Sequence, residues 1–291
     1  MNQFKGTGVA LITPFKNDKS IDFSALERLI EHCIKNGVNY FVVLGTTGET
    51  PTLSKDEKNA VLEFVVKINN KRLPLVAGMG SNNTAELIKE MQSFPFKNDY
   101  QAFLSVTPYY NKPNQEALFQ HYAAVASLSP LPIILYNVPG RTGISMQPAT
   151  TLRLSASFKN IIGIKEASRS MAACFELVKN KPANFLVLSG DDDLVLPQIV
   201  SGMDGVISVA AQCFTKDFCG MVKAALSNDF GTAKNLHYQL IDGVNLLFKE
   251  GNPAGVKAAL HILGICENEL RLPLIPASEE LYQQIADFLK K

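Results

Sequence analysis

Short, almost continuously hydrophobic runs recur along the chain and predict eight buried strands. They lie at residues 8–15, 39–49, 73–80, 100–110, 132–139, 161–168, 185–192 and 205–211. Uninterrupted apolar runs of this length are typical of parallel strands covered on both faces, because half-exposed strands alternate apolar and polar residues instead.

Segments with helical periodicity separate these runs. In the first of them, hydrophobic residues fall on one helical face at Leu26, Leu29, Ile30, Cys33 and Ile34. The next helix opens at "SKDE" (54–57), which fits a capping box, and another opens at "NTAE" (83–86), a looser match. Eight strand–helix units favour a closed α/β barrel, the (β/α)8 or TIM barrel, over an open doubly wound sheet. We expect this barrel over residues 1–225 and a C-terminal helical appendage over residues 226–291.

Composition and charge exclude several classes of function. The chain has 291 residues, 46% of them hydrophobic, and a net charge of +1, so it gives no reason to expect a nucleic-acid partner. No apolar run approaches the roughly 20 residues of a membrane span, and the N-terminus lacks the pattern of a signal peptide. We therefore expect a cytoplasmic protein that does not bind membranes. Five cysteines without a C-x-x-C pair and four histidines without metal-ligand spacing predict reduced thiols and no metal site.

A lysine ends the sixth run, "IIGIKEAS" (161–168). Alternation along a strand puts Ile161 on the same face as Lys165 and Ile162 on the opposite face. Active sites of (β/α)8 barrels lie at the carboxyl ends of the strands, so Lys165 is a candidate for the site. Burial there disfavours the charged amine, and a neutral lysine amine forms a Schiff base with a ketone. The alternative is a strand-end lysine that extends to solvent.

Two further motifs end strands at the same edge. In "LYNVPGRTG" (135–143), the Tyr136 phenol is suited to proton transfer and the Arg141 guanidinium to binding a carboxylate. In "GTTGE" (45–49), Thr46 and Thr47 add hydroxyls beside backbone N–H groups in a loop able to hold a small carboxylate. The alternatives are a packed tyrosine, a solvated arginine and an ordinary turn.

Three consecutive acids follow the seventh run in "SGDDD" (189–193). They suggest either a metal site or caps for the next helix, and we favour caps. Barrel enzymes often bind phosphate near this position, which three carboxylates oppose. We therefore expect a small carboxylic acid as substrate, not a phosphorylated sugar.

Six motifs together resemble the dihydrodipicolinate synthase family of pyruvate-dependent class I lyases. "GTTGE", "VTPYYNKP", "YNVPGRTG", "GIKEAS", "SGDD" and "GVISV" occur in that order, and the resemblance spans essentially the whole chain. It implies condensation of pyruvate with L-aspartate 4-semialdehyde, in diaminopimelate and lysine synthesis, without a metal or organic cofactor. It also implies a homotetramer built as a dimer of dimers.

The resemblance also implies roles for individual residues. Lys165 would form the Schiff base, with Tyr136, Thr46 and Tyr110 as proton relay, and Tyr110 would reach the neighbouring subunit's site across a tight dimer. The residues that would bind substrate are Thr47 for the pyruvate carboxylate, Arg141 for the semialdehyde, Ile207 through its carbonyl, and Gly190.

Three alternatives stay open at this point. N-acetylneuraminate (sialic acid) lyase and keto-sugar-acid aldolases belong to the same class. They generally lack an arginine at the position of Arg141, and sialic acid lyase tends to have G-S-T-G-E where this chain has Thr46. A barrel that only binds a small acid is the third alternative, although such a protein has no need of a nucleophile.

A regulatory site is implied as well. Feedback-inhibited relatives would contact lysine through residues matching Asn82, Glu86 and Tyr109. They carry histidines where this chain has Lys55 and Lys58. An added cation repels the ammonium of a bound lysine, so we expect weak or absent inhibition by lysine.

Overall fold

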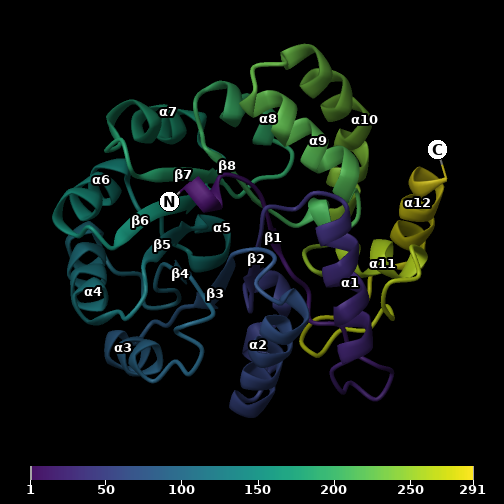
Figure 1. Cartoon of the computed structure of the whole chain (residues 1–291), viewed down its shortest axis with the longest axis horizontal. Coiled ribbons are helices and arrows are strands. Elements are labelled where there is room, and N and C mark those ends of the chain that lie inside the picture. Colours follow the sequence, from purple (N-terminus) through teal and green to yellow (C-terminus); the bar gives the residue numbers. More distant parts are fainter. Residues whose placement is uncertain (1, 291) are drawn as a thin grey trace.

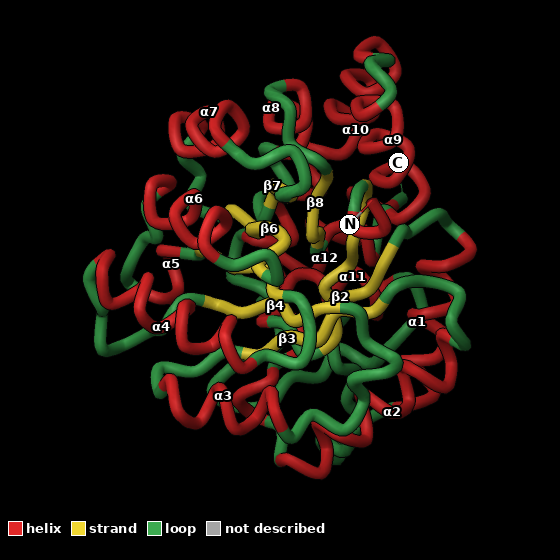
Figure 2. The backbone as a smooth tube through the Cα atoms, turned by 60° about the vertical axis from the view of Figure 1, so that its left-hand side comes forward, coloured by secondary structure: helices red, strands yellow, loops and turns green. Residues whose placement is uncertain are grey.

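The computed structural model describes residues 2–290 and confirms the predicted (β/α)8 barrel. Eight parallel strands close in chain order, each overlapping one predicted run. They are β1 (Gly6–Ala10), β2 (Tyr40–Val43), β3 (Leu75–Met79), β4 (Ala102–Val106), β5 (Ile133–Asn137), β6 (Ile161–Glu166), β7 (Leu186–Ser189) and β8 (Gly205–Ser208). The strands form the centre of the molecule and the helices surround them (Figure 1, Figure 2).

The helices that follow Ser54 and Asn83 begin where the sequence predicts. The helices of the structure are α1 (Phe23–Lys35), α2 (Lys55–Asn69), α3 (Thr84–Gln92), α4 (Gln115–Leu128), α5 (Pro139–Thr142), α6 (Pro148–Ser157), α7 (Met171–Asn180), α8 (Val195–Val200), α9 (Thr215–Leu226), α10 (Phe230–Phe248), α11 (Ala254–Ile262) and α12 (Glu279–Leu289). Ser54 and Glu57 form the predicted capping box of α2. Asn83 caps α3 by accepting hydrogen bonds from two backbone N–H groups.

The C-terminal helices α10–α12 gather on one side of the barrel, next to α9 (Figure 1). Helix α9 continues through residue 225 to Leu226 and packs along α10. The division into two parts after residue 225 stays a prediction.

The hydrophobic core has two layers, as expected for strands buried on both faces. The larger layer lies between the barrel and its helices, and the smaller one fills the barrel interior with residues such as Val42, Leu104 and Leu188. Phe4, which is 1% exposed, belongs to this interior layer and packs edge-on against Tyr40 with 5.5 Å between ring centroids. The barrel is therefore a packed core and not a channel.

Closure of the barrel depends on a glycine at the β1–β8 pair. Gly205 pairs with Gly6 and has a φ of +149°. A Cβ atom on Gly205 would lie 2.2 Å from the carbonyl oxygen of Gly6. Any other residue would push the two strands apart, so glycine is required here.

The predicted alternation at the start of β6 is wrong. The pairing register between β5 and β6 shifts, with Ile133 opposite Ile161 and Ile134 opposite Gly163. Ile162 consequently packs in the barrel interior, and Ile161 packs among the surrounding helices. An extra residue in one strand of a pair reverses the alternation locally, and this irregularity is not visible in an apolar run.

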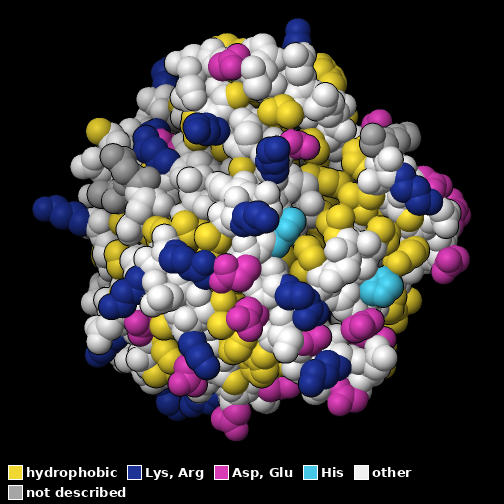
Figure 3. Space-filling view, turned by 45° about the vertical axis from the view of Figure 1, so that its right-hand side comes forward, with side chains coloured by type: hydrophobic (Ala, Val, Ile, Leu, Met, Phe, Trp, Pro, Cys, Tyr) yellow, Lys and Arg dark blue, Asp and Glu magenta, His cyan; other side chains and the backbone are white. Residues whose placement is uncertain are grey.

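Charges of both signs are interspersed with hydrophobic side chains on the face shown in Figure 3. Within residues 2–290, no helix is long and apolar enough to cross a membrane. All five cysteines are free and buried.

Candidate functional site

The side chain of Lys165 lies inside the barrel beside Tyr136. The two residues are paired in register at the carboxyl ends of β6 and β5. Lys165 is 5% exposed and Tyr136 7% exposed, and the lysine Nζ lies 4.5 Å from the centre of the phenol ring. The alternative of a lysine that extends into solvent is therefore wrong.

A second pair lies directly after the first, on the helix side of the same two strands. Asn137 donates hydrogen bonds of 3.1 and 3.0 Å from Nδ2 to the two carboxylate oxygens of Glu166. Its Oδ1 accepts from the backbone N–H of Met146 at 2.9 Å. Glu166 is buried, which raises the pKa of its carboxyl group. This pair fixes the register in which Tyr136 and Lys165 face each other.

Gly190 provides the space that the lysine side chain occupies. Its backbone N–H donates to the carbonyl of Glu166 at 2.8 Å, which brings the end of β7 against β6. A Cβ atom on Gly190 would lie 2.9 Å from Cε of Lys165 and 2.6 Å from Cβ of Ala167. Ile207, on β8, lies in the same interior layer as Tyr136.

The "GTTGE" segment forms a single 3-10 turn, η2 (Thr46–Gly48), at the end of β2. The left-handed residues here are Glu49, which ends the segment, and Leu44, which precedes it, with φ of +51° and +59°. Neither glycine of the segment has a positive φ. Thr13 donates from Oγ1 to the carbonyl of Gly48 at 2.7 Å. Thr47 is 2% exposed, so its hydroxyl is withdrawn from bulk solvent.

A cavity of about 470 Å³ opens above these residues. Its lining includes Thr46, which follows β2, and Tyr136 and Arg141, which lie at and just after the end of β5. Arg141, on the short helix α5, donates from Nη2 to the carbonyl of Asn252 at 3.3 Å. Lys165 does not line the cavity and is adjacent to it through Tyr136.

Tyr110 is not brought to this cavity by its own chain. It is 86% exposed and has a φ of +74°, a strained conformation for a residue with a side chain. Tyr109 is 41% exposed and lines the cavity.

The residues implied in regulation are only partly brought together. Lys58 and Tyr109 line the cavity, whereas Asn82 and Glu86 do not. The carbonyl of Asn82 accepts from Nδ2 of Asn111 at 3.1 Å, and Glu86 is exposed on α3.

The prediction that "SGDDD" caps the next helix is wrong, because α8 has no side-chain cap. Asp192 instead accepts from the backbone N–H groups of Val209 and Ala210, at 2.9 and 2.8 Å, and so holds the end of β8. Asp193 pairs with Arg169. Burial raises the pKa of Asp191 to about 6. Within the described part of the chain, no group of three or more His, Cys, Asp and Glu side chains is arranged to hold a metal ion.

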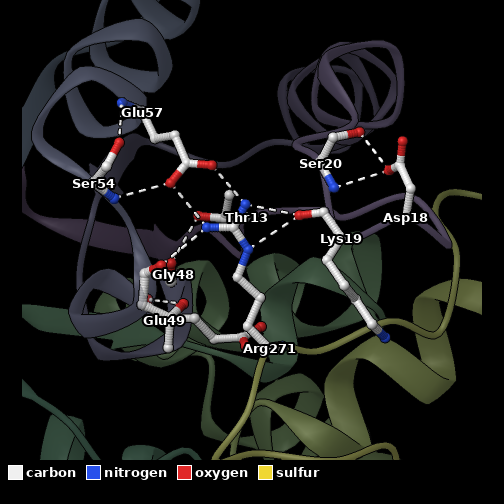
Figure 4. Close-up of polar contacts among 10 residues, drawn as sticks. Thr13, Asp18, Lys19, Ser20, Gly48, Glu49, Ser54, Glu57 and Arg271 are labelled. Carbon is white, nitrogen blue, oxygen red and sulfur yellow. Dashed lines mark hydrogen bonds and ion pairs between the residues drawn. The ribbon is translucent and has the colours of Figure 1, made fainter.

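Sequence reasoning missed the contacts that join the C-terminal segment to the "GTTGE" loop. Lys257 and Glu49 form an ion pair in which both side chains are fully buried. The backbone N–H of Arg271 donates to Glu49 at 3.0 Å, and the Arg271 guanidinium pairs with Glu57 (Figure 4). Asn252 donates from Nδ2 to Oγ1 of Thr47 at 3.0 Å. These partners are more than 200 positions apart in sequence, so no local pattern predicts them.

A lysine amine buried beside a phenol at the mouth of a (β/α)8 barrel defines the class of Schiff-base-forming lyases. Comparison with known proteins narrows this class. The model of the dihydrodipicolinate synthetase family matches residues 3–291, and the chain belongs to that family.

Individual relatives agree with this assignment. A protein of Flavobacterium psychrophilum named 4-hydroxy-tetrahydrodipicolinate synthase is 49% identical over 291 residues, covering 100% of this chain and 99% of the relative. One of the same name from Parabacteroides distasonis is 46% identical over 287 residues, covering 99% and 96%. The crystal structure of dihydrodipicolinate synthase from Thermotoga maritima superposes with a TM-score of 0.96 at 40% identity, covering 99% of this chain and 98% of that one. The resemblance inferred from the six motifs is confirmed, and so is the expected activity of a carbon–carbon bond-forming lyase of this kind.

Proposed function

We propose that this chain condenses pyruvate with L-aspartate 4-semialdehyde through a Schiff base on Lys165. The observation that carries the proposal is the placement of the Lys165 amine, which is 5% exposed and 4.5 Å from the ring of Tyr136. A lysine amine held beside a phenol in this way is positioned to attack a ketone in its neutral form.

The reaction proceeds in three stages on this amine. Lys165 attacks the pyruvate ketone, and loss of water leaves a protonated imine. Loss of a methyl proton then gives an enamine, whose carbon attacks the aldehyde of the second substrate. The amine of the adduct finally attacks the imine carbon, which closes the ring and releases Lys165. Tyr136 and Thr46 pass protons between these stages, and their common place in the cavity lining supports this assignment.

Recognition of the two carboxylic acids is assigned to residues at the carboxyl ends of the strands. Thr47 holds the pyruvate carboxylate at the end of β2, and Arg141 binds the carboxylate of the semialdehyde at the cavity. Gly190 and Ile207 bound the site from β7 and β8. The closely related lyase for N-acetylneuraminate is the competing assignment. Steady-state assays with L-aspartate 4-semialdehyde and with N-acetylneuraminate separate the two, and turnover of the latter alone would overturn the proposal.

Tyr110 completes the proton relay in the site of a second copy of the chain. Its 86% exposure and its φ of +74° support this assignment, because an exposed, strained aromatic residue is placed to meet a partner surface. Two such dimers form the expected homotetramer.

Complementation between two inactive variants tests the exchange of Tyr110. In a mixed dimer of Lys165→Ala and Tyr110→Phe chains, one site has both a native lysine and a native tyrosine from its neighbour. Co-expression of the two chains therefore restores activity that neither variant has alone. If Tyr110 served its own site, the mixture would remain as inactive as the separate variants.

Reduction with borohydride tests the Schiff base directly. In the presence of pyruvate, borohydride is expected to add one reduced pyruvate to Lys165, detected by peptide mass spectrometry, and nothing to a Lys165→Ala variant. Absence of labelling in the native chain would contradict the Schiff base and favour the alternative of a barrel that only binds a small acid. The cytoplasmic location stays a prediction.

A further inference from the structure

Asn252 connects the two acid-binding groups of the site, although it lies outside the barrel strands. It stands between α10 and α11 and is 9% exposed. Its Nδ2 donates to Oγ1 of Thr47 at 3.0 Å, and its backbone carbonyl accepts from Nη2 of Arg141 at 3.3 Å. Asn252 also lines the cavity.

The direction of the hydrogen bond between Asn252 and Thr47 determines whether the Thr47 hydroxyl can donate to a ligand. A threonine hydroxyl has one hydrogen and two acceptor lone pairs. Since Asn252 donates to Oγ1, it occupies a lone pair and leaves the hydroxyl hydrogen uncommitted. Within residues 2–290, Thr47 Oγ1 has no other hydrogen-bond partner. The hydroxyl is thereby set as a donor, which is the role that a carboxylate requires.

The segment that carries Asn252 is held against the loop that carries Thr47 at two further points. Lys257 pairs with Glu49, and the backbone N–H of Arg271 donates to the other oxygen of the same carboxylate. Figure 4 shows Arg271 beside Glu49 and Glu57 in this junction. The segment that carries Asn252 is therefore held near Thr47 by these contacts as well as by the hydrogen bonds of Asn252 itself.

We propose that Asn252 is a positioning residue for keto-acid binding: it presents the Thr47 hydroxyl as a hydrogen-bond donor and supports Arg141 through its carbonyl. The proposal rests on the proposed function, because it assigns the carboxylate that Thr47 receives to pyruvate. It gives the C-terminal helical segment a direct part in the site.

The test measures pyruvate binding without the second substrate. The rate of borohydride trapping is recorded against pyruvate concentration for the native chain and for Asn252→Ala, Thr47→Val and the double variant. We expect Asn252→Ala and Thr47→Val each to raise the half-saturating pyruvate concentration about tenfold or more, as for loss of a hydrogen bond to a charged group. The trapping rate at saturating pyruvate stays near the native rate, because Lys165 is untouched.

Non-additivity is the decisive readout, since a residue acting through another adds nothing once that residue is gone. The double variant is expected to be no weaker than the worse single variant. The proposal would be overturned if the fold-increases in half-saturating pyruvate concentration of the two single variants multiplied in the double variant. It would also be overturned if Asn252→Ala bound pyruvate like the native chain. Failure of the native chain to trap pyruvate would instead reject the proposed function.

Asn252→Asp keeps the shape of the side chain and provides a second test if the alanine variant does not fold. An ionised aspartate accepts only, so it turns the Thr47 hydrogen away from the ligand and raises half-saturation. In the Thr47→Val background this penalty is expected to vanish, whereas a penalty of equal size there would come from charge alone and contradict the proposal. Asn160→Ala is the matched control, because the Asn160 amide donates to the carbonyl of Ala126 at 2.7 Å just before β6. It is expected to bind pyruvate like the native chain.

Discussion

Replacement of Lys257 by methionine tests how strongly the C-terminal segment is bound to the site loop. Lys257 and Glu49 are both fully buried, and Nζ of the lysine lies 2.5 Å from Oε1 of the glutamate. The same ammonium donates to the carbonyl of Glu269 at 2.7 Å and lies 4.1 Å from the ring centre of Phe15. Burial lowers the pKa of Lys257, and the charge of Glu49 opposes that effect.

The cost of the substitution follows from what it leaves behind. Methionine fills the volume of the lysine stem but leaves the Glu49 carboxylate buried. Within residues 2–290, the backbone N–H of Arg271 is then the remaining hydrogen-bond donor to that carboxylate, with the Arg271 guanidinium nearby. Removing one partner of a buried ion pair costs about 3–5 kcal/mol, because the other charge stays buried and unpaired. We therefore expect the free energy of unfolding to fall by about 3–5 kcal/mol, a large part of the 5–15 kcal/mol typical of a folded domain.

A second variant separates lost charge from lost packing. Glu49→Gln combined with Lys257→Met removes both charges and keeps an acceptor for Arg271. Replacing a whole buried pair by neutral groups is often nearly neutral, so we expect the double variant to recover most of the loss.

Urea unfolding followed by circular dichroism measures these free energies. All variants are compared at one protein concentration, because association adds to apparent stability. A loss below about 1 kcal/mol for Lys257→Met would refute the reasoning, given the cost expected of an unpaired buried charge. A double variant as unstable as the single one would refute it equally.

Three further predictions concern the site and its surroundings. Gly190→Ala is expected to slow borohydride trapping of pyruvate at least tenfold while the protein stays folded, because the added methyl group would lie 2.9 Å from Cε of Lys165. Trapping at the native rate would show that this methyl group does not displace the lysine. The Arg271 guanidinium lowers the pKa of Glu57 to about 2. The contribution of this ion pair to the free energy of unfolding is therefore complete above the unfolded-state pKa of about 4.3, and it is lost as pH falls toward 2. Glu57→Gln should therefore lower the free energy of unfolding in urea by about 1 kcal/mol at pH 7, a modest value because the carboxyl group is 30% exposed and screened by solvent. The loss should be smaller at pH 3, and an equal loss at both pH values would argue against the ion pair. Added L-lysine is expected to leave the steady-state rate almost unchanged because Lys58 adds a positive charge at the implied regulatory site, and strong inhibition at micromolar lysine would show this expectation to be wrong.

The barrel was predictable from the amino-acid sequence, and so were the candidate residues at its strand ends. Eight apolar runs predict the eight strands because parallel strands buried on both faces tolerate few polar residues. The place of Lys165 at a strand end, together with the rule for barrel active sites, predicts it as a residue of the site. Short stretches of sequence are sufficient for these conclusions, since the apolar pattern of a buried strand and the cap of a helix each involve only a few consecutive residues.

Contacts between distant segments, in contrast, became apparent from the folded structure alone. The register shift in β6 reverses the faces of Ile161 and Ile162, and Asp192 binds the end of β8 instead of capping a helix. Asn252 meets Thr47 across 205 positions of sequence. No local sequence pattern predicts such contacts, because they depend on which loops the closed barrel brings together and not on the residues next to each contact in the sequence.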